Sequence, residues 1–125
     1  EDADAARAMR DAVAAFESGD LGVADRELNR LVEQWPNWAE AWNKRATLRF
    51  VEERDTDSLD DIARTLELEP RHFGALAGFG QICLRARDAS SALLAFERAI
   101  AVNPNMVSIR QAAEVLRKQD TRTIH

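Results

Sequence analysis

The sequence has little of what disulfide scaffolds, membrane spans and linkers are made of. It contains one cysteine, so no disulfide can form within the chain. No apolar run reaches the length of about 18 residues that a membrane-spanning helix needs. Five glycines and three prolines are too few for a collagen-like or linker-like chain, and tyrosine is absent. What remains is one ordinary domain of 125 residues.

Alanine and charge are what the chain has in abundance. Alanine is the commonest residue, and 31% of the residues are charged, a composition that favours helices. The net charge is −5, and the basic residues are dispersed along the chain and have acidic neighbours. Phosphate backbones and anionic lipid surfaces attract clustered positive charge. We therefore expect no nucleic acid and no membrane among the partners.

Candidates for catalytic or metal chemistry are few. His72 and His125 lie far apart and give no metal-ligand spacing with Cys83. We expect His72 to be structural or solvent-exposed and Cys83 to be a buried, inert thiol. Asp60 and Asp61 lack the glycine-bearing loop of a calcium site, so a charged helix start is the better interpretation. The sequence therefore predicts no enzyme, no cofactor and no metal.

A fixed period organises the chain. Its only prolines are Pro36, Pro70 and Pro104, and the two intervals between them are equal. Self-similarity at such a period indicates a repeat architecture. Other columns agree at the same period: Ala12, Ala46 and Gly80; Phe16, Phe50 and Leu84; Ala24, Ser58 and Ala92; Leu28, Ile62 and Phe96.

The third repeat, with Phe79-Gly80, Ala92, Phe96 and Pro104, resembles the tetratricopeptide (TPR) repeat. That repeat is a helix–turn–helix unit whose length matches the interval between the prolines. The second repeat departs from the family pattern by placing arginines in two apolar columns, and the first repeat matches more weakly. The resemblance covers about residues 5–119. It implies an all-α, right-handed α-solenoid of about seven antiparallel helices in a single domain, 1–125. The repeats would span about 5–38, 39–72 and 73–106, with a capping helix at about 106–119.

The helices are predicted at 5–18, 22–34, 39–53, 58–68, 73–86, 90–102 and 106–119. Gly19 suits the left-handed conformation at a helix end, and Asp20 and Asp88 suit the N-caps of the helices that follow. The second repeat has Glu53-Arg54 instead, which predicts an irregular turn with its next helix capped by Asp55, Thr56 or Asp57. The final helix is expected to show a polar outer face, as the end of a solenoid requires.

The resemblance also implies a function, because TPR proteins are typically adaptors that hold a peptide or protein segment in a concave groove. The first helix of each repeat lines that groove. The corresponding positions here are Met9, Val13, Phe16, Asn43, Lys44, Thr47, Phe50, Val51, Ala77, Gln81, Leu84 and Arg85. The recurring Phe16, Phe50 and Leu84 form an apolar stripe, which is open to a ligand, covered within the chain, or used for self-association. The alternative function is thus a structural module that self-associates through this stripe.

One TPR subtype is a poor match. Chaperone-binding TPR domains hold a terminal carboxylate with lysine, asparagine and arginine side chains. The corresponding positions carry Met9, Val13, Lys44, Gly74 and Gly78, of which only one is a cation. We therefore expect no carboxylate clamp for chaperone tails.

Two local features lead to further expectations. Asp11 and Arg45 share a column in consecutive repeats, so they are predicted to form an ion pair between adjacent first helices. Trp35, Trp38 and Trp42 surround the first repeat junction, where packing is the expected role and an exposed Trp38 could instead anchor a partner.

Localisation is open. The segment from Trp42 to Gly80 resembles a group of small proteobacterial TPR proteins that often carry signal peptides. The chain begins at Glu1 rather than methionine, which fits a removed leader and equally fits a trimmed chain. The expectation favours a bacterial, exported or periplasmic protein over a cytoplasmic one.

Overall fold

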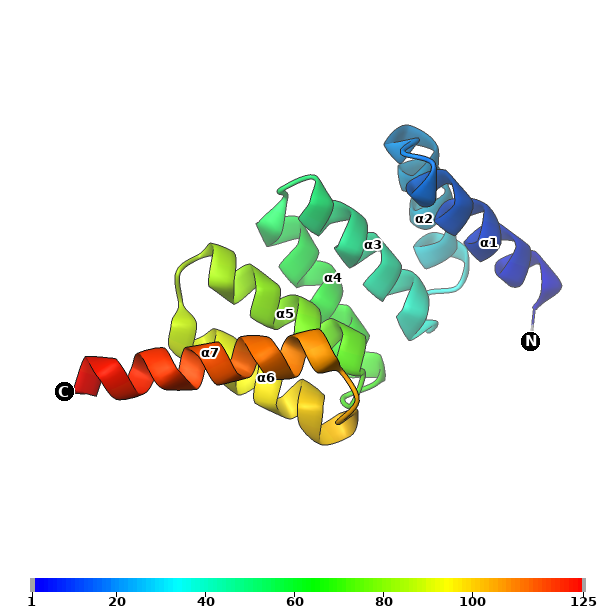
Figure 1. Cartoon of the computed structure of the whole chain (residues 1–125). Helices are drawn as coiled ribbons and strands as arrows, with labels where there is room; N and C mark the ends of the chain where they lie inside the picture. The colour runs from blue at the N-terminus through cyan, green and yellow to red at the C-terminus, as the bar shows by residue number, and fades with distance from the viewer. Residues whose placement is uncertain (1, 125) are drawn as a thin grey trace. The chain divides into compact units, whose positions relative to one another are not determined.

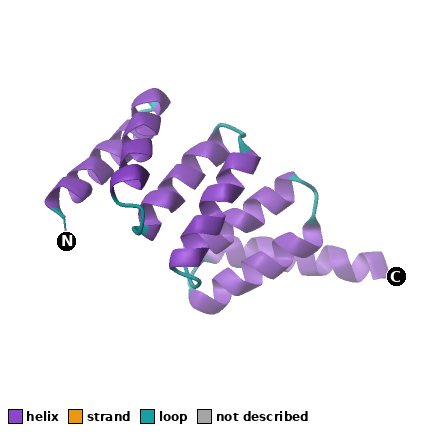
Figure 2. Ribbon diagram, turned by 180° about the vertical axis from the view of Figure 1, so that it is seen from behind, coloured by secondary structure: helices purple, strands orange, loops and turns teal. Residues whose placement is uncertain are grey.

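A computed structural model describes residues 2–124, with side chains described through residue 119, and every element in this part is an α-helix (Figures 1 and 2). The helices are α1 (Ala3–Glu17), α2 (Leu21–Gln34), α3 (Ala39–Val51), α4 (Asp55–Leu68), α5 (Phe73–Arg85), α6 (Ala89–Val102) and α7 (Val107–Ile124). The predicted all-α fold and its seven helices are confirmed. Most ends lie within three residues of the prediction, and α7 continues five residues further than expected.

The chain divides into two compact units at Glu69 and Pro70, which we call the first and the second unit. In the first unit α1 packs on α2, α3 packs on α4, and α2 packs on α3. In the second unit α5 packs on α6, and α7 packs on α6. Each unit is thus built from helix hairpins, as the repeat predicts.

The three prolines separate the hairpins. Helices α2, α4 and α6 each end two residues before a proline, at Gln34, Leu68 and Val102. Proline has no N–H to donate and its ring clashes with the preceding helical turn, so it cannot continue the helix. Because each proline ends the helix before it, the equal spacing of the prolines gives helix ends that are equally spaced along the chain.

Within each hairpin the turn has the same geometry three times. The residues after the first helix are Ser18-Gly19-Asp20, Glu52-Glu53-Arg54 and Ala86-Arg87-Asp88. In each case the third residue donates its N–H to the carbonyl five residues back, at 2.8 Å. The middle residue is left-handed each time, with φ of 84°, 61° and 65°. Gly19 takes this conformation without a Cβ clash, whereas Glu53 and Arg87 take it at a cost of roughly 1–2 kcal/mol.

The prediction of an irregular second turn is therefore wrong. Helix α4 begins at Asp55, Arg54 is its N-cap, and no side chain accepts a capping hydrogen bond there. Asp20 and Asp88 do cap their helices, accepting from the N–H groups of Val23 and Ser91 at 3.2 Å. The prediction relied on the missing glycine and aspartate. The turn forms without them, because its backbone hydrogen bonds to the end of the preceding helix are the same as in the other two hairpins.

Close approach of the two helices in the third hairpin depends on Gly80. A Cβ placed on Gly80 would lie closer than 3.0 Å to three ring carbons of Phe96, which is fully buried. The equivalent columns hold Ala12 with Leu28 and Ala46 with Ile62, all of them buried. The smallest residue of this column thus faces the largest residue of the other, so Gly80 serves the close packing of α5 on α6.

The final helix is amphipathic as predicted. Ile109, Ala113 and Leu116 are its buried residues, at no more than 7% exposure. Arg110, Glu114, Arg117 and Lys118 are exposed. The exposed side of α7 is thus largely polar, as the end of a solenoid requires, although Val107 and Val115 also lie in solvent, at 61% and 54% exposure.

Replacing Glu53 by glycine should raise the free energy of unfolding by about 0.5–1 kcal/mol. The left-handed strain of a non-glycine residue is removed, and the flexibility that glycine adds to the unfolded chain offsets only part of this gain. Urea denaturation followed by circular dichroism measures the change. Gly19→Ala is the matched control, because an added Cβ there meets no atom within 4 Å and only the backbone effect remains. The two substitutions should have opposite signs, and equal signs would contradict the account.

Gly80→Ala should destabilise the chain by about 1–3 kcal/mol, because the new methyl group overlaps the Phe96 ring. Adding Phe96→Leu should recover part of the loss, since Ala and Leu are the pair found in the first repeat. Gly22→Ala is the control, because its Cβ would meet only Asp20 Oδ1 at an ordinary 3.9 Å. Thermal melts of the wild type and the three variants measure these changes, and a Gly80→Ala protein as stable as wild type would refute the packing argument.

Candidate functional site

The predicted partner surface consists of one face of each first helix, and α1 and α3 carry it in the first unit. On α3 the opposite face is packed, with Ala41, Ala46 and Leu48 at 2% exposure or less. Of the predicted positions, Thr47 and Val51 are exposed, whereas Met9, Val13, Phe16, Asn43, Lys44 and Phe50 are half-buried. Val51 is 51% exposed, so an apolar side chain stands in solvent at the end of α3.

In the second unit the predicted positions lie on α5. Gln81, Leu84 and Arg85 are exposed, and Leu84 keeps 37% of its surface. Ala77 is the exception, because it is only 7% exposed and offers little surface to a ligand. Most of the predicted positions on α5 are thus accessible to solvent, and their role in binding a partner stays a prediction.

The predicted ion pair between Asp11 and Arg45 is wrong. Asp11 is exposed on α1, whereas the Arg45 guanidinium holds both carboxylate oxygens of Asp61 on α4, at 2.9 and 3.0 Å. Its third contact is to Asn29 Oδ1 on α2, at 3.0 Å. The shared column at positions 11 and 45 was a weak guide, because it ignored the acidic residue within the same hairpin.

Asp61 is the centre of a buried polar network. Its side chain is 2% exposed and receives a second guanidinium, that of Arg49, at 3.0 Å. Asn29 extends the network by donating its amide N–H to Asp25 Oδ2 at 3.3 Å. We call Asp25, Asn29, Arg45, Arg49 and Asp61 the polar network. It joins α2, α3 and α4 of the first unit.

The two arginines and Asp61 of the polar network occupy columns that are apolar in the third repeat. The columns of Arg45, Arg49 and Asp61 hold Phe79, Cys83 and Ala95 in the third repeat. Two of its atoms, Arg49 Nε and Asp25 Oδ1, are buried with no hydrogen-bond partner among the described residues. Burying charge in this way is costly unless every charge is paired, so the second hairpin depends on Asp61 in a way its neighbours do not.

A buried hydroxyl beside the network is also satisfied. Ser58 replaces the alanine of its column and is fully buried. Its hydroxyl donates to the Ala46 carbonyl on the facing helix at 2.7 Å. The departure from alanine therefore adds a hydrogen bond between α3 and α4 and leaves no unpaired polar group.

Two guanidiniums lie over the ring of Trp42. The Arg45 carbon Cζ is 5.1 Å from the ring centroid, and that of Arg64 is 5.8 Å away. The indole Nε1 donates to the Pro36 carbonyl at 2.8 Å, which fixes the ring against the link between α2 and α3. Both distances fall within the range at which a cation is attracted to an aromatic face.

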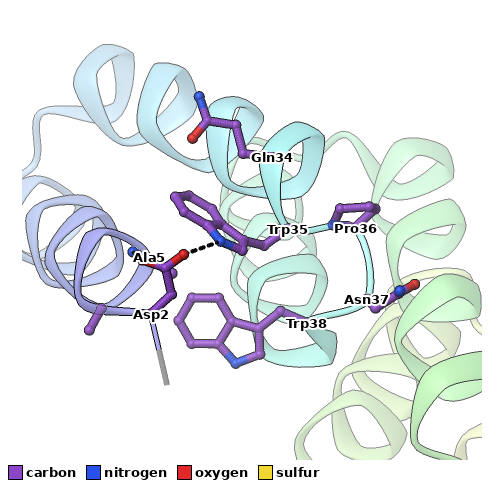
Figure 3. A pocket seen from close by; sticks show the side chains of 8 residues that line it. Asp2, Ala5, Gln34, Trp35, Pro36, Asn37 and Trp38 are labelled. Carbon is purple, nitrogen blue, oxygen red and sulfur yellow. Dashed lines mark hydrogen bonds between the residues drawn. The ribbon is translucent and has the colours of Figure 1, made fainter.

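The other two tryptophans line a pocket of about 470 Å³ in the first unit (Figure 3). Their indoles reach from the link between α2 and α3 toward Asp2 at the start of α1 (Figure 3). The lining residues are Asp2, Ala5, Ala6, Gln34, Trp35, Pro36, Asn37 and Trp38. Both tryptophans are half-buried, so Trp38 combines packing with an accessible surface.

Asp2 is the charged group of this pocket. Its Oδ2 accepts the Trp35 Nε1 hydrogen at 3.0 Å, and its Oδ1 accepts from the N–H groups of Asp4 and Ala5. The hydrogen bond from Trp35, followed by that from the Asp4 backbone, lowers the pKa of Asp2 below its ordinary value. The carboxylate is therefore ionised at neutral pH, and it loses these bonds only as the pH falls through that lowered pKa.

The remaining candidates carry no chemistry. Cys83 is 8% exposed, so the prediction that its thiol is buried is confirmed, and this burial raises the pKa of the thiol. His72 Nδ1 accepts the Ala75 N–H at 3.0 Å and so caps α5, a structural role as predicted. His125 lies outside the described residues. Among the described residues no group of three acidic, histidine or cysteine side chains could hold a metal, and no helix is suited to cross a bilayer.

Asp61 and Asn29 are the residues whose importance the sequence did not reveal. Asp61 was interpreted as part of a charged helix start, yet it is 1% exposed. The signal that could have found it is the pair of arginines in apolar columns, because two buried cations require an acid on the facing helix.

Asp61→Asn should lower the free energy of unfolding of the first unit by about 3 kcal/mol. The substitution keeps the shape of the side chain but leaves two guanidiniums, each 15% exposed, without a counter-charge. All three tryptophans lie in the first unit, so urea denaturation followed by tryptophan fluorescence reports on it. Asp60→Asn makes the same change at the adjacent exposed position and should stay within about 0.5 kcal/mol of wild type. Equal effects of the two substitutions would contradict the role given to Asp61.

No protein-family model matches the sequence. A TPR repeat-containing protein of Rhizobium etli is 40% identical over 77 residues. This match covers 62% of the present chain and 38% of the relative, so the chain spans about two fifths of that protein's length.

Solved structures share the fold at low sequence identity. The TPR2B domain of yeast Sti1, in complex with pHsp70, has a TM-score of 0.82 and 16% identity, covering 92% of this chain and 97% of that one. The first TPR domain of Spaghetti (RPAP3), bound to the HSP90 peptide SRMEEVD, has a TM-score of 0.86 and 14% identity, covering 94% and 93%. The TPR domain of Arabidopsis OM64 has a TM-score of 0.86 and 15% identity, covering 92% and 95%.

The solved structures show that the chain shares the fold of TPR domains. The Rhizobium relative shows a similarity in sequence as well, to a protein that contains TPR repeats. With three equally spaced prolines and hairpins that repeat at the same period, the chain has the helical-repeat fold of tetratricopeptide repeat domains and is similar over 77 residues to the TPR repeat-containing protein of Rhizobium etli.

Proposed function

We propose that the chain is a non-enzymatic binding module that holds a peptide or protein segment on the exposed faces of its first helices. TPR domains generally mediate protein–protein interactions, and two of the solved relatives were determined with a chaperone segment bound. The comparisons indicate no catalytic family, and the described residues include no group of three acidic, histidine or cysteine side chains that could hold a metal.

The observation that carries the proposal is the two-sided character of α3. One side is packed into the first unit, whereas the other keeps Thr47 and Val51 in solvent although nothing in the fold requires valine there. On α5, Leu84 occupies the column next to that of Val51 and is also exposed. Each unit thus exposes an apolar side chain near the end of a first helix, and this supports recognition of an apolar ligand segment.

The ligand class differs from that of the chaperone-binding relatives. Met9, Val13, Gly74 and Gly78 stand where a carboxylate clamp needs amides and cations. Lys44 is the one cation in these positions, and its ammonium group is 3.4 Å from Glu40 on the same helix. A terminal carboxylate would find little to hold it, so the ligand we propose is recognised through its apolar side chains.

Peptides selected from a random library on the purified chain, then titrated by calorimetry, test the proposal. Val51→Asp and Leu84→Asp, made separately, should each weaken the selected peptides at least about tenfold, because a buried carboxylate in an apolar contact is costly. Leu94→Asp and Val115→Asp are matched controls, since both side chains are similarly exposed on α6 and α7, and they should change affinity less than about twofold.

Three results would count against the proposal. A selection that yields no saturable binder would refute it, as would peptides that bind all four variants equally. Sedimentation that shows a dimer broken by Val51→Asp or Leu84→Asp would favour the alternative, a module that self-associates through these faces.

A further inference from the structure

The three tryptophans of the chain are in two different situations. Trp42 is part of a complete arrangement, because the Arg45 guanidinium lies on its ring and both oxygens of Asp61 bind that guanidinium from the side. An indole, a guanidinium and a carboxylate thus form one unit of contacts, and the chain supplies all three.

The pocket at Trp35 and Trp38 has two of these three components. It offers two indoles and the Asp2 carboxylate, and no basic residue belongs to its lining. Among the described side chains, guanidiniums lie over Trp42 and none lies over Trp35 or Trp38. The cavity of about 470 Å³ lies within the range of small-ligand sites.

The carboxylate can accept further donors. Asp2 already receives three hydrogen bonds, from Asp4, Ala5 and Trp35, and an ionised carboxylate has about four acceptor positions. The Trp35 contact also holds that indole beside the charge, so the two are fixed relative to each other before any ligand arrives. The net charge of −5 adds a weak attraction for a cationic segment.

We infer that this pocket binds an arginine side chain of a partner peptide, with the guanidinium on the indole surface and against the Asp2 carboxylate. Arginine suits the site better than lysine, because its planar group stacks on aromatic faces and pairs with a carboxylate through two hydrogen bonds. The site is separate from the first-helix faces of the proposed function and does not depend on them.

The two arginines near the pocket, Arg7 and Arg64, already have partners within the chain. Arg64 lies over Trp42 and contacts the Pro36 carbonyl and Asn37 Oδ1, at 3.4 and 3.5 Å, without lining the pocket. Arg7 pairs with Asp4 at 3.8 Å on the exposed side of α1. Neither residue supplies the missing guanidinium of the pocket.

The test is a titration with the peptide acetyl-Gly-Arg-Gly-Gly-amide, observed through the three indole N–H signals in a nitrogen–proton NMR spectrum. The signals of Trp35 and Trp38 should move and saturate with a dissociation constant of about 1 mM, whereas that of Trp42 should stay in place. The same peptide with citrulline, which has the shape of arginine without its charge, should bind at least about tenfold more weakly.

Two substitutions separate the pocket charge from the general charge of the chain. Asp2→Asn should weaken the arginine peptide about tenfold, and asparagine still caps a helix start well, so α1 should remain intact. Asp4→Asn removes the same charge two residues away, outside the pocket, and should change the affinity less than about twofold.

Any of three results would overturn the inference. These are no saturable shift up to about 20 mM peptide, equal binding of the arginine and citrulline peptides, or equal effects of Asp2→Asn and Asp4→Asn. The first two come from the wild-type chain, so a failure of the variants to fold would not decide the matter. Val51→Asp and Leu84→Asp should leave this titration unchanged, which keeps the outcome distinct from that of the proposed function.

Discussion

Close approach of two helices within a hairpin is the constraint on which the fold depends. Facing positions must share a fixed space, so the volume gained on one helix has to be given up on the other. The chain meets this condition with glycine beside phenylalanine in the third hairpin, and with alanine accompanying leucine or isoleucine in the first two. The turn that joins the helices then repeats its hydrogen bonds in every hairpin, even where its residues strain against the left-handed conformation.

The second hairpin meets the volume constraint with Ala46 beside Ile62 and also buries charge between its helices. Two arginines stand in columns that are apolar in the third repeat, and Asp61 on the facing helix binds both of them. Such a substitution costs desolvation energy, and replacing the set by apolar residues of similar size is often neutral or stabilising. The long arginine side chains make contacts that shorter apolar residues could not make. Arg45 binds Asp61 and Asn29 at the same time, and its guanidinium also lies over the ring of Trp42. The polar network thereby joins α2, α3 and α4 and fixes one indole at the link between hairpins.

The sequence predicted what depends on periodicity and missed what depends on pairing. Proline and small-residue columns recur at fixed steps, so helix number, helix ends and the packing role of Gly80 follow from a pattern along the chain. The partner of Arg45 does not, because a column compares equivalent positions in different repeats and cannot show which side chains meet across a hairpin. Asp11 occupies the column of Arg45 in the neighbouring repeat, whereas the residue that pairs with Arg45 in the structure is Asp61. The pocket at Asp2 was missed for the same reason, since 33 residues separate Asp2 from the indole it binds.

The contrast among the tryptophans bears on which surfaces of a repeat protein are available for binding. A half-buried indole with its own guanidinium and carboxylate, as at Trp42, has its polar requirements met within the chain and contributes to the fold. An indole with a carboxylate alone leaves an ionised group beside an aromatic face, and that combination gains from a cation of another molecule. Arginine far outnumbers lysine in this chain, and no arginine lines the pocket, although Arg64 lies just beyond Asn37. An arginine placed a few atoms closer would have stabilised the junction and closed the pocket. Its absence keeps the indoles and the carboxylate accessible, as a site for a partner's arginine requires.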